Sequence, residues 1–362
     1  MNRAIIIVVA LMVVVSALLV ITLIESKDLF IPATGSQPVV VISTPTTPAP
    51  SPAPKVEVTP QPQPTNPAGS TQPAGAAKPA LLVSGGILKQ VMVAVMPRAG
   101  ELLKVSIRPL APGQLPPERW QEWPIIPTVS ERAKAIYQAG LKKGTDPKHF
   151  SKIGDCQVIR QYFLGLFDDD VDSRLGNSPY QNLIPTIKAF EGSWTRVSMA
   201  VRTGFNVASV LSTINSDPKL CKANETPLEC EFRIWNPSIV VISMETWTAD
   251  RPTNLYEGYL RQIVEFVLAR GALPILATKA DNLEKDHSIN LSIARVAFDY
   301  DIPLWNFWRA AYALPDHGLL DDGFHLTNGT HDFGNPETMK LAWPVRNITF
   351  VQAFEKVWKA VK

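Results

Sequence analysis

The chain has 362 residues, a formal net charge of +2 and three cysteines. Because the charges nearly balance and no run of Lys and Arg forms a basic stripe, the composition argues against nucleic acid as a partner. The 32 prolines are unevenly spread along the chain, which indicates that part of its length lies outside a folded core.

The first 30 residues predict a membrane anchor. Residues 4–24 are apolar except for one serine and one threonine, and at 1.5 Å per residue such a helix is roughly 30 Å long, which matches the hydrocarbon core of a bilayer. A cleaved signal peptide is the alternative, but its apolar region usually spans only about 7–15 residues. With Arg3 on the amino side, we expect a single-pass anchor in the cell membrane and an extracellular C-terminal domain.

Three further regions follow the anchor. Residues 31–80 are rich in Pro, Thr and Ser and predict a disordered, extended linker that bears the folded part away from the membrane. Residues 81–115 contain two runs typical of strands, at 87–95 and 102–107, and predict a small β-rich flank. Residues 116–362 form the predicted main domain.

The main domain alternates between strand and helix patterns. A helix is expected from Ser130 to near Gly144. Apolar runs at 238–244, 273–278 and 302–307 predict buried strands, amphipathic stretches between them predict helices, and a last helix is expected over 350–361. This order implies right-handed crossovers and an α/β fold with a parallel sheet covered on both faces. In such sheets, sites form beyond the carboxyl ends of the strands.

Two separated stretches contain residues suited to nucleophilic catalysis. Residues 150–156 form an apolar run that ends in Gly154, Asp155 and Cys156, as expected where a strand turns and presents a nucleophile. Asp322 and His325 stand three residues apart after the last predicted strand. Together they supply a nucleophile, a base and a residue that orients the base.

These stretches resemble two sequence blocks of the SGNH/GDSL hydrolases. Residues 153–156, Ile-Gly-Asp-Cys, are similar to the block that carries the nucleophile, and residues 322–325, Asp-Gly-Phe-His, are similar to the final Asp-x-x-His block. The resemblance implies a flavodoxin-like three-layer domain that hydrolyses acyl or acetyl esters, including those of carbohydrates. His325 would be the general base and Asp322 its orienting carboxylate.

The chain departs from this family at two positions. Cys156 replaces the serine, although a thiolate can carry out the same acyl transfer. Where the family has Gly-x-Asn-Asp, this chain has Glu245 and Trp247 at the glycine and asparagine positions, and the loss of one oxyanion donor typically costs about 3 kcal/mol. With Asp155, these two side chains are expected to line the substrate pocket.

The sequence offers several candidates for the oxyanion donors. The backbone of Cys156 is one candidate, and Gly204 is another, with Gly192 as its rival. The hydroxyl of Thr246 or Thr248 would replace the missing asparagine amide.

Two functions follow from the sequence. One is a membrane-tethered hydrolase of ester bonds that uses Cys156, and the other is an inactive relative whose cleft binds a glycan or a protein at the cell surface. An ester or glycan substrate is expected for the hydrolase, and no cofactor is needed for this chemistry.

The remaining cysteines predict a disulfide. Cys221 and Cys230 are close in the sequence and suit a loop disulfide in an oxidising exterior, which leaves Cys156 as the free thiol. The acidic residues at 168–172 lack the glycine and glutamate of a calcium loop, and the histidines fall at no metal-ligand spacing, so no metal site is expected.

Overall fold

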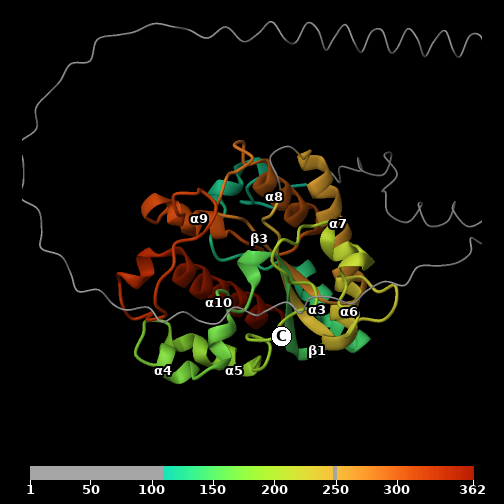
Figure 1. Cartoon of the computed structure of the whole chain (residues 1–362), viewed down its shortest axis with the longest axis horizontal. Helices are drawn as coiled ribbons and strands as arrows, with labels where there is room; N and C mark the ends of the chain where they lie inside the picture. Colours follow the sequence, from blue (N-terminus) through green and yellow to red (C-terminus); the bar gives the residue numbers. More distant parts are fainter. Residues whose placement is uncertain (1–108, 248–250) are drawn as a thin grey trace, which may run out of the picture. The chain divides into compact units, whose positions relative to one another are not determined.

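The computed structural model describes residues 109–247 and 251–362 (Figure 1). The chain divides into two units, Met1–Leu82 and Val83–Lys362, and every described residue belongs to the second. The predicted anchor, the linker and the two strands predicted in the flank lie outside the described residues. Within the described ranges, no helix is both long enough and apolar enough to cross a membrane.

A four-stranded parallel sheet forms the centre of the fold, as the alternation of patterns predicts. The strands lie in the order β1-β2-β3-β4, and adjacent strands are paired in parallel. Their bounds are β1 (Asp146–Gly154), β2 (Pro237–Ser243), β3 (Leu273–Ala277) and β4 (Leu304–Trp305).

The side chains of the sheet alternate between two buried apolar clusters, which are the two faces of the sheet. On β2, Ile239 and Val241 belong to one cluster, whereas Val240 and Ile242 belong to the other. Because all seven residues of β2 are buried, both faces of this strand are covered, and its sequence is a continuous apolar run as expected for a central parallel strand.

Helices cover both faces for a topological reason. Strands in sequential order with right-handed crossovers place their connecting helices on one face. These helices, which contribute to the cluster with Val240, are α6 (Pro227–Trp235), α7 (Thr253–Ala269) and α8 (Ser288–Tyr300). The opposite face is covered by helices before β1, after β4 or in the long segment after β1 (Figure 1), namely α3 (Glu131–Lys143), α4 (Val171–Leu175), α5 (Ile184–Ala189), α9 (Phe307–Tyr312) and α10 (Ala342–Val361).

The chain between β1 and β2 passes along the free edge of β1 before it reaches β2. After α4 and α5, Val201 forms a single parallel bridge with Gly154 at the end of β1. There Gly154 donates from its N–H to Ala200 and accepts from Arg202. The chain then crosses to α6 and enters β2, so β1 has β2 on one side and the Val201 bridge on the other.

Local chemistry explains where several elements begin and end. α3 begins after Ser130, whose hydroxyl accepts from the N–H of Ala133, and ends at Gly144 in the left-handed conformation, as predicted. α10 begins at Ala342, eight residues before the predicted start at 350. A strand over 302–307 was expected, but β4 has only two residues. It is short because Pro303 lacks an N–H for strand pairing and Asn306 already caps α9.

Candidate functional site

Asp155 joins the carboxyl ends of β1 and β2. Its Oδ2 accepts hydrogen bonds from the backbone N–H groups of Glu245 (2.7 Å) and Thr246 (2.6 Å), and its Oδ1 accepts from the N–H of Gln157 at 3.0 Å. The preceding Gly154 permits this junction, because a Cβ there would lie 2.6 Å from the carbonyl oxygen of Ser243. The completely buried carboxylate of Asp155 therefore fixes the backbone just after Cys156 and the backbone that follows β2.

Cys156 is a half-buried free thiol beyond the end of β1. Burial raises the pKa of this thiol to about 11, and the negative charges of Asp155 and Glu245 add to the increase, while hydrogen bonding with its own backbone and the Thr246 side chain opposes it. Cys156 is therefore protonated at neutral pH and requires a base to become a nucleophile.

Asp322 and His325 form a preassembled pair in an exposed turn. Asp322 Oδ2 lies 2.5 Å from His325 Nδ1, and its Oδ1 accepts from the backbone N–H groups of Phe324 (3.0 Å) and His325 (2.9 Å). The hydrogen bond from His325, followed by the two backbone donors, lowers the pKa of Asp322 to about 2. With Nδ1 donating to this carboxylate, His325 Nε2 is the ring's acceptor.

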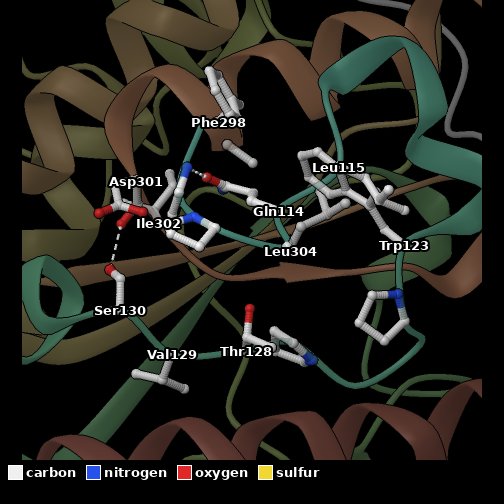
Figure 2. Close-up of a pocket in the computed structure, with 16 residues that line it drawn as sticks. Gln114, Leu115, Trp123, Thr128, Val129, Ser130, Phe298, Asp301, Ile302 and Leu304 are labelled. Atoms are coloured by element: carbon white, nitrogen blue, oxygen red, sulfur yellow. Dashed lines mark hydrogen bonds between the residues drawn. The ribbon is translucent and has the colours of Figure 1, made fainter. Parts of the chain in front are cut away.

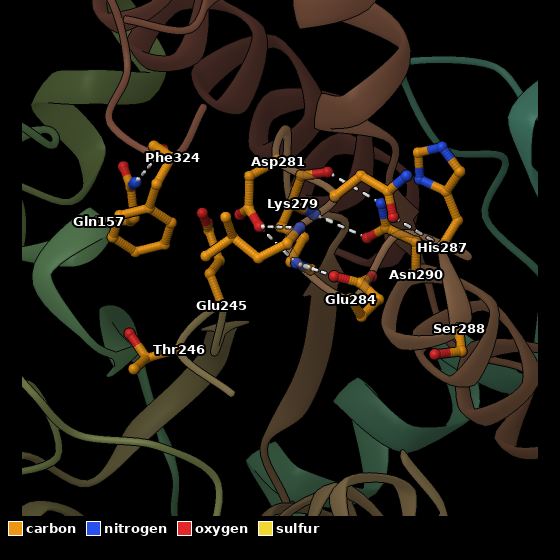
Figure 3. A network of polar contacts seen from close by, with 12 residues as sticks. Gln157, Glu245, Thr246, Lys279, Asp281, Glu284, His287, Ser288, Asn290 and Phe324 are labelled. Carbon is orange, nitrogen blue, oxygen red and sulfur yellow. Dashed lines mark hydrogen bonds and ion pairs between the residues drawn. The ribbon is translucent and has the colours of Figure 1, made fainter. Parts of the chain in front are cut away.

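The two stretches predicted to be catalytic are neighbours, but Cys156 and His325 are not hydrogen-bonded to each other. Gln157 Nε2 lies 3.5 Å from the carbonyl oxygen of Phe324, at the outer limit of a hydrogen bond (Figure 3). Both residues are adjacent in sequence to a predicted catalytic residue. Between the described residues Cys156 and His325 themselves, the structure has no hydrogen bond. The fold thus brings the segments together without forming a nucleophile–base hydrogen bond.

The predicted oxyanion donors differ in their availability. The N–H of Thr246 is already bonded to Asp155, but its hydroxyl faces Cys156 closely enough to affect the pKa of the thiol. Gly204 lies in an exposed turn three residues after the Val201 bridge, with a φ of +82° and open space around it. Its rival Gly192 donates its N–H to Asp168 at 2.9 Å. The N–H of Gly192 is therefore already engaged.

Trp247 is buried, and its indole N–H is already used as a donor. Its indole N–H donates to the carbonyl oxygen of Arg251 at 3.3 Å, and its ring packs against Tyr256 and Tyr259 of α7. The predicted second candidate, Thr248, lies outside the described residues. The indole therefore stabilises the connection between β2 and α7.

Glu245 forms a buried ion pair that the sequence analysis did not anticipate. Its Oε1 accepts from Arg346 Nη2 at 2.5 Å and from the Ser243 hydroxyl at 2.8 Å. Burial raises the pKa of Glu245 to about 7, although the positive charge of Arg346 opposes the increase. A usable signal for Arg346 existed, because it precedes Phe350 and Phe354 at four-residue intervals on the buried face of a helix.

A second buried polar cluster follows β3 and was also missed. Lys279 Nζ lies 2.6 Å from Asp281 Oδ1 and 2.6 Å from Glu284 Oε2, as Figure 3 shows. The side chain of Asn290 accepts from the N–H of Lys279 and donates to its carbonyl oxygen, both at 2.9 Å. The signal in the sequence was a group of charged residues directly after a buried strand, where α/β proteins form their sites.

A pocket lies beside the start of β4 (Figure 2). It has a volume of about 460 Å³ and is lined by Trp123, Ile302 and Leu304, among others. Because Leu304 is the first residue of β4, this pocket is at an amino end of the parallel sheet. It contains none of the predicted catalytic residues.

Cys221 and Cys230 form a disulfide with an S–S distance of 2.10 Å. Among the described residues, one group of three side chains has the spacing needed to hold a metal ion, namely Cys221, Glu225 and Cys230. Both of its sulfur atoms belong to the disulfide, so this group is not a set of free metal ligands.

Comparison with known proteins adds no family assignment to this geometry. No protein-family model matches the chain, and a search of curated proteins found no match.

Proposed function

We propose that residues 116–362 form a divergent, flavodoxin-like SGNH/GDSL domain that hydrolyses acyl or acetyl esters. The observation that carries the proposal is the pairing of Asp322 with His325, which leaves Nε2 as an acceptor on a turn next to the Cys156 segment. The position of β1 between β2 and the Val201 bridge supports the finer fold assignment. Sites in doubly wound sheets form where the strand order reverses. In this proposal the order reverses at β1, and Cys156 lies just beyond its carboxyl end.

In the proposed reaction, His325 Nε2 takes the proton of the Cys156 thiol while Sγ attacks the ester carbonyl carbon. The tetrahedral intermediate collapses, the C–O bond to the alcohol breaks, and the alcohol leaves with the proton from His325. Water then attacks the thioester as His325 takes one of its protons, the C–S bond breaks, and Cys156 recovers its proton. Asp322 holds the imidazole orientation and stabilises its charged form.

The developing oxyanion needs at least one donor. We assign this role to the backbone N–H of Cys156, which also contacts its own thiol, and to the hydroxyl of Thr246. The carboxylate of Glu245 would oppose the negative charge of the intermediate, but its ion pair with Arg346 reduces this effect.

Proton removal has to occur in the substrate complex, because the pKa of Cys156 near 11 keeps the free thiol protonated. Catalytic hydrogen bonds often shorten only when substrate binds. The Asp322–His325 turn is exposed and lies against Gln157 through a long contact of 3.5 Å. We therefore expect substrate binding to move this turn toward Cys156.

A binding module without turnover is the second candidate, and three observations favour it. Cys156 and His325, both within the described residues, share no hydrogen bond; the pKa of the thiol is raised; and the N–H of Thr246 is occupied by Asp155. In this alternative the same edge of the sheet would hold a glycan or a protein ligand without cleaving it.

A chromogenic acetyl ester separates the two candidates. We expect the wild-type protein to hydrolyse it and the His325→Ala and Cys156→Ala variants to lose about a hundredfold or more in kcat/KM. His317→Ala is a matched control, because His317 is an exposed histidine that stacks on Tyr312 outside the site. Equal background rates in all four proteins would contradict the hydrolase and favour the binding module.

The proposal also includes a membrane tether at residues 1–30 and an extended linker at residues 31–80, which would hold the domain outside the cell. In cell fractionation, the full chain should remain with membranes after an alkaline wash, whereas a chain lacking residues 1–30 should be recovered in the soluble fraction. Recovery of the full chain in the soluble fraction would exclude a retained anchor.

A further inference from the structure

The pocket beside β4 is a gap in the cover of that strand. β4 is the last strand in the sheet of the described chain and is paired with β3. On its other side, Ile125 accepts a hydrogen bond from the N–H of Asn306 at 3.2 Å. Farther along, the hydroxyl of Ser130 donates to the carbonyl oxygen of Asp301 at 3.2 Å. The pocket lies between these two hydrogen bonds, where Leu304 lines it (Figure 2).

The backbone of Leu304 points toward this gap. The N–H of Leu276 donates to the carbonyl oxygen of Pro303, and the N–H of Thr278 donates to that of Trp305, so the residues on either side of Leu304 face β3. Because backbone groups alternate in direction along a strand, the N–H and C=O of Leu304 face away from β3. In the described part of the chain, no residue pairs with them. The edge of the sheet is open here, and native proteins usually cover such edges.

The walls of the gap are largely apolar. Ala297, Ile302 and Leu304 form one side and are each at most 7% exposed. Trp123 also lines the pocket, and residues 111–115 complete it. A pocket of about 460 Å³ forfeits van der Waals contacts along these walls. Because the described chain begins only two residues before the 111–115 segment, the chain just upstream leads to the rim of the pocket.

The segment upstream of this rim has the pattern of a strand with one apolar face. Residues 103–108 read Leu-Lys-Val-Ser-Ile-Arg, so apolar and polar side chains alternate with the period of a strand. They lie outside the described residues. When extended, such a sequence presents Leu103, Val105 and Ile107 on one side and polar groups on the other. Ile107 is four residues before Ala111, which keeps it within about 14 Å of the pocket rim.

The other predicted strand of the flank fits the pocket less well. Residues 91–95 are apolar at all five positions, which is typical of a strand buried on both faces. A pocket that opens to solvent accepts one apolar face and leaves the other in water. Val95 is also sixteen residues before Ala111, so the loop that returns it is longer and costs more entropy to close. The nearer segment is therefore the better occupant, and it belongs to the same compact unit as the pocket.

We propose that residues 102–107 lie extended across this pocket and cover the open edge of β4. The three apolar side chains of the segment insert between α8 and Trp123, and its polar side chains stay in water. Burial of apolar surface drives the contact, and the short connection to Ala111 keeps the entropy cost of closing the loop low. The folded domain then begins near residue 102, and a segment of the chain itself, not a substrate, occupies the pocket.

Disulfide trapping in the full chain, held in detergent micelles, tests this placement. Thr128→Cys puts a thiol on the pocket lining at an exposed position, and Cys156→Ala removes the free native thiol. A second cysteine is then introduced at one position at a time from 103 to 107. Closure is followed by mass spectrometry of digests without reductant, so the native disulfide stays intact.

Closure should alternate along the segment. Because a disulfide needs Cβ atoms about 3.5–4.5 Å apart, we expect closure to be fastest at one of the apolar positions, in Leu103→Cys, Val105→Cys or Ile107→Cys. In the neighbouring Lys104→Cys and Ser106→Cys variants, closure should be at least about tenfold slower. These two variants are matched controls, because their distance along the chain from the pocket rim is almost the same.

A charge should be tolerated on only one face of the segment. Val105→Asp places a carboxylate in the pocket, so we expect the melting temperature of the full chain to fall by about 2–4 °C. Ser106→Asp adds the same charge on the solvent side and should change the melting temperature by less than about 1 °C. Neither readout requires ester hydrolysis, so the placement is tested independently of the proposed function.

Alternating closure within one chain, together with a melting temperature lowered only by Val105→Asp, would support the placement. Equal closure rates at all five positions, or equal melting temperatures of Val105→Asp and Ser106→Asp, would overturn it. Disulfides that join two chains on a non-reducing gel would put a second copy in the pocket and would also overturn it. Closure at none of the positions would mean that the segment lies elsewhere.

Discussion

Arg346 of α10 and Glu245, which follows β2, form an ion pair with a distance of 2.5 Å although both side chains are at most 1% exposed. The guanidinium is surrounded by the rings of Phe163, Phe307 and Trp305. Glu245 in turn donates its backbone N–H to Asp155. A residue of the last helix thus supports the backbone next to the candidate nucleophile.

Loss of one partner of this pair should strongly destabilise the fold. Arg346→Met leaves the carboxylate of Glu245 buried without a cation, so we expect the free energy of unfolding in urea to fall by about 3–5 kcal/mol. The double variant Arg346→Met with Glu245→Gln should recover part of this loss, because the unpaired charge is gone. If the single and double variants are equally unstable, the ion pair is not the cause.

The reactivity of Cys156 should report the charge of Glu245. Because Glu245 helps to raise the pKa of the thiol, Glu245→Gln should lower that pKa and shift the pH profile of alkylation by iodoacetamide to lower pH. The wild-type rate should keep rising up to a pH of about 11, since the thiolate is the reactive form. Glu191→Gln should leave the profile unchanged. A profile that stays fixed in Glu245→Gln would show that burial and the charge of Asp155 raise the pKa without a contribution from Glu245.

Asp322→Asn should reduce activity with little effect on stability. The carboxylate orients His325, so its loss should lower kcat for the chromogenic ester by about tenfold or more. Because Asp322 is an exposed turn residue, we expect the free energy of unfolding to change by about 0.5 kcal/mol or less. A large loss of stability together with activity would instead assign Asp322 a structural role.

Lys152 should make the stability of the domain increase with pH above neutrality. Burial lowers the pKa of this strand residue from 10.5 to about 7, so the unfolded chain binds more protons than the folded chain between these values. The free energy of unfolding should therefore rise with pH in this window, by at most about 1.4 kcal/mol per pH unit. Below a pH of about 7, the destabilisation caused by burying the charged lysine should reach its full size and no longer change with pH.

Urea unfolding of the wild type and Lys152→Met at several pH values from about 7 to about 9 tests this expectation. Lys152→Met should show a flatter dependence, although it removes the hydrogen bond from Lys152 Nζ to the carbonyl oxygen of Trp194. Parallel curves for the two proteins would mean that Lys152 is not the group that titrates.

Reduction of the disulfide should weaken the segment before α6. Cys221 and Cys230 are nine residues apart, and closing a loop of this size stabilises a fold by roughly 2–3 kcal/mol in the chain-entropy model. We expect a mild reductant to lower the melting temperature of the wild type but not of a Cys221→Ser, Cys230→Ser double variant. An equal decrease in both proteins would point to an effect other than this disulfide.

Sequence patterns were sufficient where the controlling interactions are local or repeat regularly. The apolar runs at 238–244 and 273–278 predicted β2 and β3, because a strand buried on both faces needs apolar residues throughout. The pairing of Asp322 with His325 was also predictable, since they stand three positions apart in one turn.

The sequence did not reveal how the side chains at the ends of the strands are paired. It did not indicate that Glu245 pairs with Arg346, 101 residues away, or that the indole of Trp247 donates to Arg251 and packs on α7. Lys279 and Asp281 were overlooked because charged residues after a strand are usually solvated, whereas here both are 1% exposed.

The sequence by itself determined the α/β class with its parallel sheet, the strands β2 and β3, and the local Asp322–His325 pair, because each depends on neighbouring residues or on a repeating pattern. Only the tertiary structure decided that Cys156 and His325 are not hydrogen-bonded and that the carboxylates at the strand ends are buried. Those relationships depend on how segments more than 100 residues apart pack, and no local pattern encodes that packing.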